Sequence, residues 1–203
     1  MKFFVVVGLG LLLVCTRAAA VKNDSGDILD CVVITNKTSA DITTGCTEVR
    51  SKDNQVVTRS EYVNGVKHGV ETHYFDHNRV RITLAYINGV QEGLETHFYK
   101  EGEKKAEITY IQGKKNGNMI SWYPSGKLLG VAVLKDDLHD QMSQSWYENG
   151  TLKAVGYFKN GHQNGQEIQY YDNGKKRSEG TFLHGKLDGL ARQWYIDGTR
   201  KSE

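Results

Sequence analysis

Histidine and glutamate side chains are the residues of this chain best suited to chemistry, and both recur at a fixed spacing. His73 and His97 are 24 residues apart, as are Glu71 and Glu95, and Glu167 follows at three times that spacing. Such recurrence is typical of a repeated surface, because a zinc site needs several ligands brought together and acid–base catalysis needs groups within reach of one substrate. We therefore expect the histidines to decorate the surface and the glutamates to mark a solvated face.

The chain lacks the motifs that mark common enzyme sites. No serine stands in a nucleophile elbow, and no glycine cluster has the spacing of a phosphate-binding loop. The sequence therefore predicts a protein that is not an enzyme. It predicts no catalytic residues, no metal, no cofactor and no small-molecule substrate.

Glycines are spaced for turns, in three series that recur every 24 residues and contain 15 of the 22 glycines. The first two series are each interrupted once, at Asp137 and Gln141, and the third is preceded by Asn78. The series are Gly65, Gly89, Gly113, Gly161 and Gly185; Gly69, Gly93, Gly117, Gly165 and Gly189; and Gly102, Gly126, Gly150, Gly174 and Gly198. An ungapped period of this length indicates a repeat protein.

Each repeat reads as a β-hairpin. The unit that starts at Gly113 is expected to comprise a turn, a short strand, a tight turn and a return strand, at residues 113–117, 118–123, 124–126 and 127–135. A later tight turn carries Asn149-Gly150, and Asn-Gly is a strong hairpin signal. We predict an all-β fold, an elongated antiparallel hairpin meander or solenoid of about six 24-residue units over residues 48–203.

Residues 1–20 predict a secretory signal peptide. Lys2 precedes an uncharged apolar run over residues 3–14, and small residues stand at positions 18–20. That run is short for a membrane-spanning helix, although an uncleaved anchor and a buried strand stay alternatives. Cys15 loosely resembles the lipid-modified cysteine of bacterial lipoproteins, despite the poorly fitting Val14 before it. Attachment to a membrane is therefore expected only if Cys15 is lipidated.

Residues 21–47 are expected to form a small N-terminal cap that covers the first sheet edge. Signal cleavage leaves Cys31 and Cys46, and an even number of cysteines in an exported chain favours a disulfide. The short polar loop between them has little core of its own, so the bond would stabilise the cap by about 3 kcal/mol.

The net charge argues against some partners. Removing residues 1–20 removes Lys2 and Arg17 and no acidic residue, so the formal charge falls from +2 to 0. A neutral chain has no basic excess to attract a phosphate backbone or an anionic membrane. We expect no nucleic-acid partner.

Two short segments that recur along the chain carry a family resemblance. They stand at residues 146–150 as Trp-Tyr-Glu-Asn-Gly and at residues 160–165 as Asn-Gly-His-Gln-Asn-Gly. The pattern resembles the bacterial variant of the MORN repeat found in YwqK-type antitoxins, and covers roughly residues 48–203. The resemblance implies a protein toxin as partner. With the signal peptide, it leads to the hypothesis of a periplasmic immunity protein that neutralises a secreted effector, for example a phospholipase.

Paired aromatic residues at the strand ends are the predicted contact surface, because tyrosine and tryptophan dominate binding hot spots. The predicted partner-binding residues are Trp122, Tyr123, Trp146, Tyr147, Tyr171, Trp194 and Tyr195. Two alternatives stay open. The rings could serve only the packing between hairpins, and the chain could be a cell-envelope scaffold or a glycan- or lipid-binding repeat protein.

Overall fold

The computed structural model describes residues 21–22, 28–29, 31–33 and 44–202, with the side chains of residues 44–201. In this part of the chain the fold is all-β, as predicted, with one 3-10 turn, η2 (Asp76–Asn78). None of its helices is long and apolar enough to cross a membrane. The strands are β1 (Val21–Lys22), β2 (Ile28–Leu29), β3 (Cys31–Val33), β4 (Thr44–Arg50), β5 (Val56–Val63), β6 (Val66–Tyr74), β7 (Val80–Ile87), β8 (Val90–Gln91), β9 (Gly93–Phe98), β10 (Lys104–Ile111), β11 (Lys114–Trp122), β12 (Leu128–Lys135), β13 (Leu138–Trp146), β14 (Leu152–Lys159), β15 (His162–Gln163), β16 (Gly165–Tyr170), β17 (Lys176–Leu183), β18 (Lys186–Leu187), β19 (Arg192–Trp194) and β20 (Arg200–Ser202).

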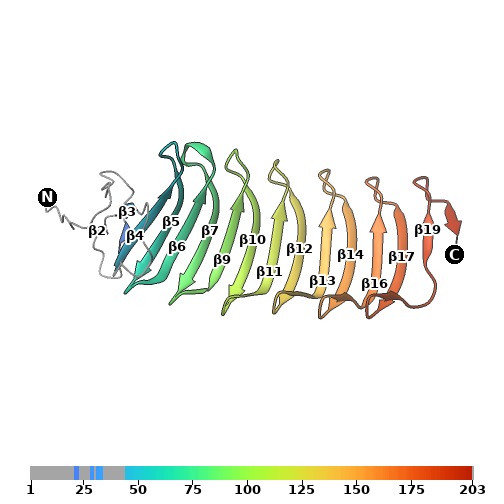
Figure 1. Cartoon of the computed structure of the whole chain (residues 1–203). Coiled ribbons are helices and arrows are strands. Elements are labelled where there is room, and N and C mark those ends of the chain that lie inside the picture. Colours follow the sequence, from blue (N-terminus) through green and yellow to red (C-terminus); the bar gives the residue numbers. More distant parts are fainter. Residues whose placement is uncertain (1–20, 23–27, 30, 34–43, 203) are drawn as a thin grey trace.

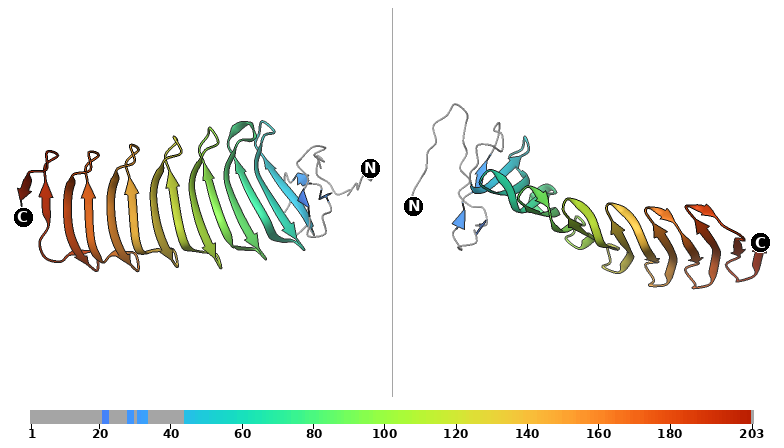
Figure 2. Two further views of the ribbon diagram at one scale, coloured as in Figure 1. Left: turned by 180° about the vertical axis from the view of Figure 1, so that it is seen from behind. Right: turned by 90° about the horizontal axis from the view of Figure 1, so that it is seen from below.

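Strands β3 to β20 form one open sheet in which hairpins follow one another in chain order (Figure 1). From β4 onwards the pairings are antiparallel, whereas β3 pairs in parallel with β4. The first and last strands lie at opposite ends of this sheet, and the sheet twists along its length (Figure 2). In the described residues no second layer covers it. The predicted elongated hairpin repeat is therefore confirmed.

One long edge of the sheet consists of two-residue turns in which both residues have positive φ. The angles are 50° and 81° in Asn160-Gly161, the combination that a type I′ turn requires. Asp136-Asp137, at the break in the glycine series, has φ angles of 49° and 69° and so keeps the same turn. The Lys115 backbone N–H donates to Asp137 Oδ1 at 2.9 Å, a contact that glycine could not make.

In the second glycine series, Gly69 and Gly117 lie inside strands, Gly93 and Gly165 begin strands, and Gly189 lies between β18 and β19. Strand β11 begins at Lys114, and Gly117 within it has a φ of 99°. The register between β10 and β11 shifts between Ile108 and Tyr110, opposite this glycine. A positive φ together with a register shift marks a β-bulge. The prediction of a turn over residues 113–117 is therefore wrong, because the turn ends before β11 starts.

The opposite edge consists of longer turns with a left-handed residue, which is asparagine in the first two turns (Asn54 and Asn78) and glycine from Gly102 onwards. Gly126 N–H donates to the Tyr123 carbonyl at 2.9 Å, and Tyr123 N–H donates to the Lys127 carbonyl at 2.8 Å. Asn149 has no positive φ; its Oδ1 accepts a hydrogen bond from Thr151 N–H at 2.9 Å. The predicted hairpins are present, but Asn-Gly on this edge belongs to a turn in which only glycine needs the left-handed region.

Packing within one layer yields a thin core. Ile108, Tyr110 and Leu134 form a buried cluster, with Met119 packed against it. Ile108 pairs with Met119 across neighbouring strands, so the cluster spans successive hairpins on one face. Stability must therefore come from contacts between adjacent repeats, as in other solenoids.

Replacing Gly117 with alanine should lower the free energy of unfolding by about 1–2 kcal/mol, because its φ of 99° strains any side chain. The added Cβ would also lie 3.4 Å from Thr109 Cβ. Gly156→Ala is the matched control, since its φ lies outside the left-handed region and its Cβ would meet Phe158 and Glu167 at 3.6 and 3.7 Å. The control should be neutral or up to about 1 kcal/mol more stable. Equal denaturation midpoints for the two variants would contradict the bulge assignment.

The predicted N-terminal features lie mostly outside the described residues. This holds for the signal peptide over residues 1–20, for Cys15 and for much of the cap over residues 21–47. Within the cap, the pairing of β3 with β4 sets Cys31 opposite Cys46. Cys46 is fully buried, but the side chain of Cys31 is outside the described part. The cap and its disulfide therefore stay predictions.

Candidate interaction surface

In four of the aromatic pairs, the second residue is a tyrosine that links one repeat to the next. Each of these tyrosine hydroxyls donates to a backbone carbonyl of the following repeat, 23 residues further on. The bonds run from Tyr99 to Trp122 at 2.8 Å, and from Tyr123 to Trp146, Tyr147 to Tyr170 and Tyr171 to Trp194 at 2.9 Å each. We call Tyr99, Tyr123, Tyr147 and Tyr171 the tyrosine ladder. Their hydroxyls have a packing role, and a role in binding a partner stays a prediction.

The predicted tryptophans are less completely covered than a core residue would be. Trp122, Trp146 and Trp194 are half-buried, and the predicted contact residue Tyr195 is 49 % exposed. The Lys176 ammonium lies 5.7 Å from the centre of the Trp194 ring, within range of a cation–π contact. The structure thus places the predicted residues at successive strand ends, with part of each ring accessible.

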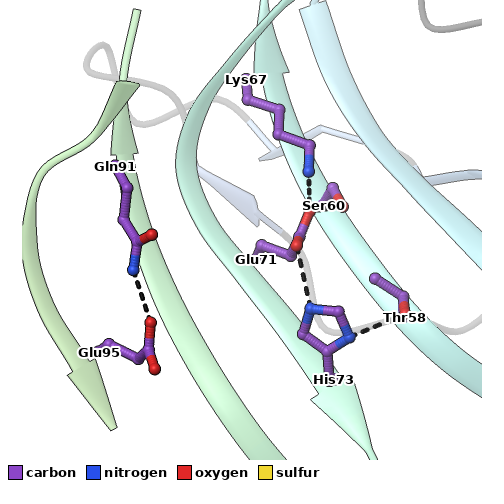
Figure 3. A network of polar contacts seen from close by, with 7 residues as sticks. All are labelled: Thr58, Ser60, Lys67, Glu71, His73, Gln91 and Glu95. Atoms are coloured by element: carbon purple, nitrogen blue, oxygen red, sulfur yellow. Dashed lines mark hydrogen bonds and ion pairs between the residues drawn. The ribbon is translucent and has the colours of Figure 1, made fainter. Parts of the chain in front are cut away.

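One face of the sheet carries a buried glutamate inside a polar network (Figure 3). Glu71 in β6 is only 7 % exposed. Its carboxylate accepts hydrogen bonds from Ser60 Oγ at 2.6 Å, from His73 Nε2 at 3.0 Å and from Lys67 Nζ. His73 Nδ1 lies 3.2 Å from Thr58 Oγ1 on the neighbouring strand. The network therefore combines an ion pair with hydrogen bonds across two strands.

The same arrangement recurs in later repeats with fewer charges. In each repeat the residues four before and two after the glutamate hold its carboxylate. These residues are Gln91 and His97 for Glu95, at 2.7 and 2.5 Å, and Gln163 and Gln169 for Glu167, both at 2.7 Å. We call the side of the sheet that bears Glu71, Glu95 and Glu167 the glutamate face.

Burial and pairing on the glutamate face shift pKa values in ways that preserve the charges. Burial alone would raise the pKa of Glu71, but the hydrogen bonds from Lys67 and Ser60 outweigh it and hold that pKa below its usual range. Burial alone would lower the pKa of Lys67, but Glu71 raises it above the ordinary value. Burial, with the Glu95 charge, raises the pKa of Tyr110 to about 12. At neutral pH Glu71 and Lys67 are therefore both charged.

The prediction that the three glutamates mark a solvated face is wrong. Glu71 and Glu95 are buried and Glu167 is half-buried, and His73 and His97 are half-buried against the carboxylates. A shared repeat position shows only that side chains point to one face, and neighbouring strands and same-face side chains then cover them. Among the residues that the structure describes, no three histidine, cysteine, aspartate or glutamate side chains are grouped so as to hold a metal ion.

Four segments of the chain match a known repeat family. They are similar to the MORN repeat variant. The matches cover residues 91–112, 115–136, 143–160 and 163–184, and each ends on the first residue of a two-residue turn. No curated protein matches the chain. The MORN-variant resemblance inferred from the sequence is thus confirmed for the middle of the sheet.

Apolar side chains beside the two-residue turns of the early repeats form a further exposed feature, which the sequence patterns considered above do not predict. Val63, Ile87 and Ile111 directly precede these turns and are 38, 50 and 49 % exposed, and Val66 and Val90 directly follow them at 44 % each. Their recurrence every 24 residues is the sequence signal from which this row could have been predicted. A row of exposed apolar side chains is typical of an interaction site. The early repeats thus offer a second surface besides the aromatic pairs.

Proposed function

We propose that this chain is a non-enzymatic binding protein that acts as a periplasmic immunity protein and neutralises a secreted effector toxin by direct contact. The MORN-variant repeats support the binding role, because solenoid scaffolds present long surfaces made of similar units. The resemblance to YwqK-type antitoxins supports a protein toxin as partner, with a membrane-attacking phospholipase as the expected effector class.

The observation that carries this proposal is the incomplete cover of large aromatic and apolar side chains along one continuous sheet. Trp146 is half-buried although it stands in the middle of the sheet, and Tyr195 and Ile87 are about half exposed. Such side chains contribute most to binding when a partner excludes water from them. A partner laid across successive hairpins would contact several of them at once.

Export completes the proposal. A signal peptide over residues 1–20 would deliver the chain to the periplasm, where an effector injected by a neighbouring cell arrives; lipidation at Cys15 would anchor it there instead. A Cys31–Cys46 disulfide would then form in the oxidising compartment, and the register of β3 against β4 supports that pairing. Alkylation of the exported protein before and after reduction checks the bond, and equal thiol labelling in both samples would rule it out.

Capture of the product of the adjacent gene tests the proposal. The purified protein should retain that product, and Trp146→Ala should weaken retention by roughly thirtyfold, the effect of losing a hot-spot side chain. Tyr157→Ala is the control, because Tyr157 is 46 % exposed and lies outside the aromatic pairs. Circular dichroism confirms that both variants are folded.

Three outcomes count against the proposal in different ways. Failure to capture any neighbouring gene product contradicts the immunity function. Equal losses in Trp146→Ala and Tyr157→Ala contradict the assignment of the aromatic pairs as the contact surface. Retention of purified cell-wall polymer in place of a protein favours the cell-envelope scaffold.

A further inference from the structure

The glutamate face is hollowed where β13, β14 and β16 meet. The hollow has a volume of about 100 Å³, and the residues around it include Ser143, Gly156, Phe158 and Glu167. Ser143 pairs directly with Gly156, so two small residues face each other across the strands. The hollow therefore results from residue choice within a regular sheet.

Equivalent positions in earlier repeats are filled. Leu84, Ile108 and Ala132 occupy the repeat position of Gly156, and Glu71, Glu95 and Met119 occupy that of Ser143. Ile108 is 6 % exposed and belongs to the apolar cluster of the core. The side chain at the repeat position of Gly156 thus becomes smaller along the chain, from leucine and isoleucine to alanine and then glycine.

Glu167 brings a negative charge to this hollow without an internal cation. Gln163 and Gln169 each donate one hydrogen bond to its carboxylate, at 2.7 Å, and a carboxylate has about four acceptor sites. Among the described residues Glu167 takes part in no ion pair, and it is the one charged residue lining the hollow. The equivalent Glu71 does receive a cation, from Lys67 four residues earlier.

We propose, on the basis of the binding function proposed above, that this hollow takes an arginine side chain of the partner protein. The guanidinium would replace the cation that Lys67 supplies to Glu71, and would donate to the free acceptor sites of Glu167 and to Ser143 Oγ. The Phe158 ring also lines the hollow, where it can contact the same group. The ion pair between Lys67 and Glu71 lies within this chain, and the proposed ion pair at the equivalent Glu167 would form with the arginine of the partner protein.

An NMR titration of the isotope-labelled protein tests the site. The probe is N-acetyl-arginine methylamide, and the citrulline analogue is its neutral control of the same shape. The arginine compound should shift the amide signals of Ser143, Gly156 and Gln163 in a saturable way, at about tenfold lower concentration than the citrulline compound, because only arginine forms the ion pair. Equal affinities, or signals that do not move, overturn the proposal.

Two variants test separately whether arginine binding needs the space of the hollow and the charge of Glu167. Gly156→Leu fills the space with the side chain found at position 84, and its backbone accepts a Cβ at ordinary contact distances. Glu167→Gln keeps the size of the side chain and removes the charge, with Glu101→Gln as an exposed control of equal charge change. Arginine binding should weaken by about tenfold or more in both hollow variants and stay unchanged in the control. Unchanged binding in either hollow variant overturns the site.

Capture of the adjacent gene product distinguishes this inference from the function on which it rests. If Glu167→Gln and Gly156→Leu capture that product as strongly as wild type, the arginine site is wrong while the binding function stands. If wild type captures nothing, the binding function fails, whether or not the free arginine compound binds.

Discussion

Replacing Tyr123, Tyr147 and Tyr171 with phenylalanine in one chain should lower the free energy of unfolding by about 3 kcal/mol, because each lost hydrogen bond costs about 1 kcal/mol. Each hydroxyl donates to a carbonyl of the next repeat at 2.9 Å, and phenylalanine leaves that carbonyl without its donor. These bonds couple neighbouring repeats, so the denaturation transition should also broaden. Chemical denaturation followed by circular dichroism measures both effects.

Tyr157→Phe is the matched control for the ladder. Tyr157 is 46 % exposed, and no hydrogen bond of its hydroxyl is found among the described residues. Loss of the Tyr157 hydroxyl should change the free energy of unfolding by less than about 0.5 kcal/mol, as is usual for surface substitutions. If the triple variant unfolds within that margin of wild type, the ladder does not couple the repeats.

Replacing Glu71 with alanine should lower the free energy of unfolding by about 2–3 kcal/mol, since it removes the acceptor shared by several donors in a mostly buried site. Lys67, Ser60 and His73 all lose the carboxylate that they contact. Glu101→Ala deletes the same side chain from an exposed site and should leave the free energy of unfolding nearly unchanged. Similar losses in the two variants would show that the network adds nothing to stability.

The Glu71 contribution should also depend on pH. The folded pKa of Glu71 lies below its unfolded value, so the folded state binds the proton less readily and the contribution is present above the unfolded pKa of about 4.3. It is lost as pH falls through the folded pKa. Lys67 has a raised folded pKa, so its contribution is present below about 10.4 and is lost as pH rises through the folded value. The difference in free energy of unfolding between wild type and Glu71→Ala should therefore decrease at strongly acidic and at strongly alkaline pH. A difference that stays constant from neutral to strongly acidic pH would contradict the ion pair.

The hairpin architecture could be predicted from the sequence because its signals are local. Positive φ selects glycine or asparagine strongly, so an ungapped 24-residue glycine spacing defines successive turns. The position of the bulge could not be found in this way. Gly117 and Gly113 both need positive φ, and only the cross-strand register shows that one interrupts a strand and the other closes a turn.

The properties of the candidate surface depend on contacts between strands, which a single repeat does not reveal. The sequence places Glu71 and Glu95 in one column, but their burial depends on side chains from neighbouring strands. Aromatic pairs are evident in the sequence, yet the bond from Tyr147 to Tyr170 needs the spacing of two folded repeats. The hollow beside Glu167 likewise needs the alignment of Ser143 with Gly156 across the sheet.

Isothermal titration calorimetry of the purified protein with the product of the adjacent gene tests the proposed function most directly. An open sheet that holds a protein across several hairpins should bind with a saturable stoichiometry, a dissociation constant below about 1 μM and a negative heat-capacity change from apolar burial. Trp146→Ala should weaken that binding by roughly thirtyfold. Absence of heat with every neighbouring gene product, from protein shown to be folded, would contradict the immunity function.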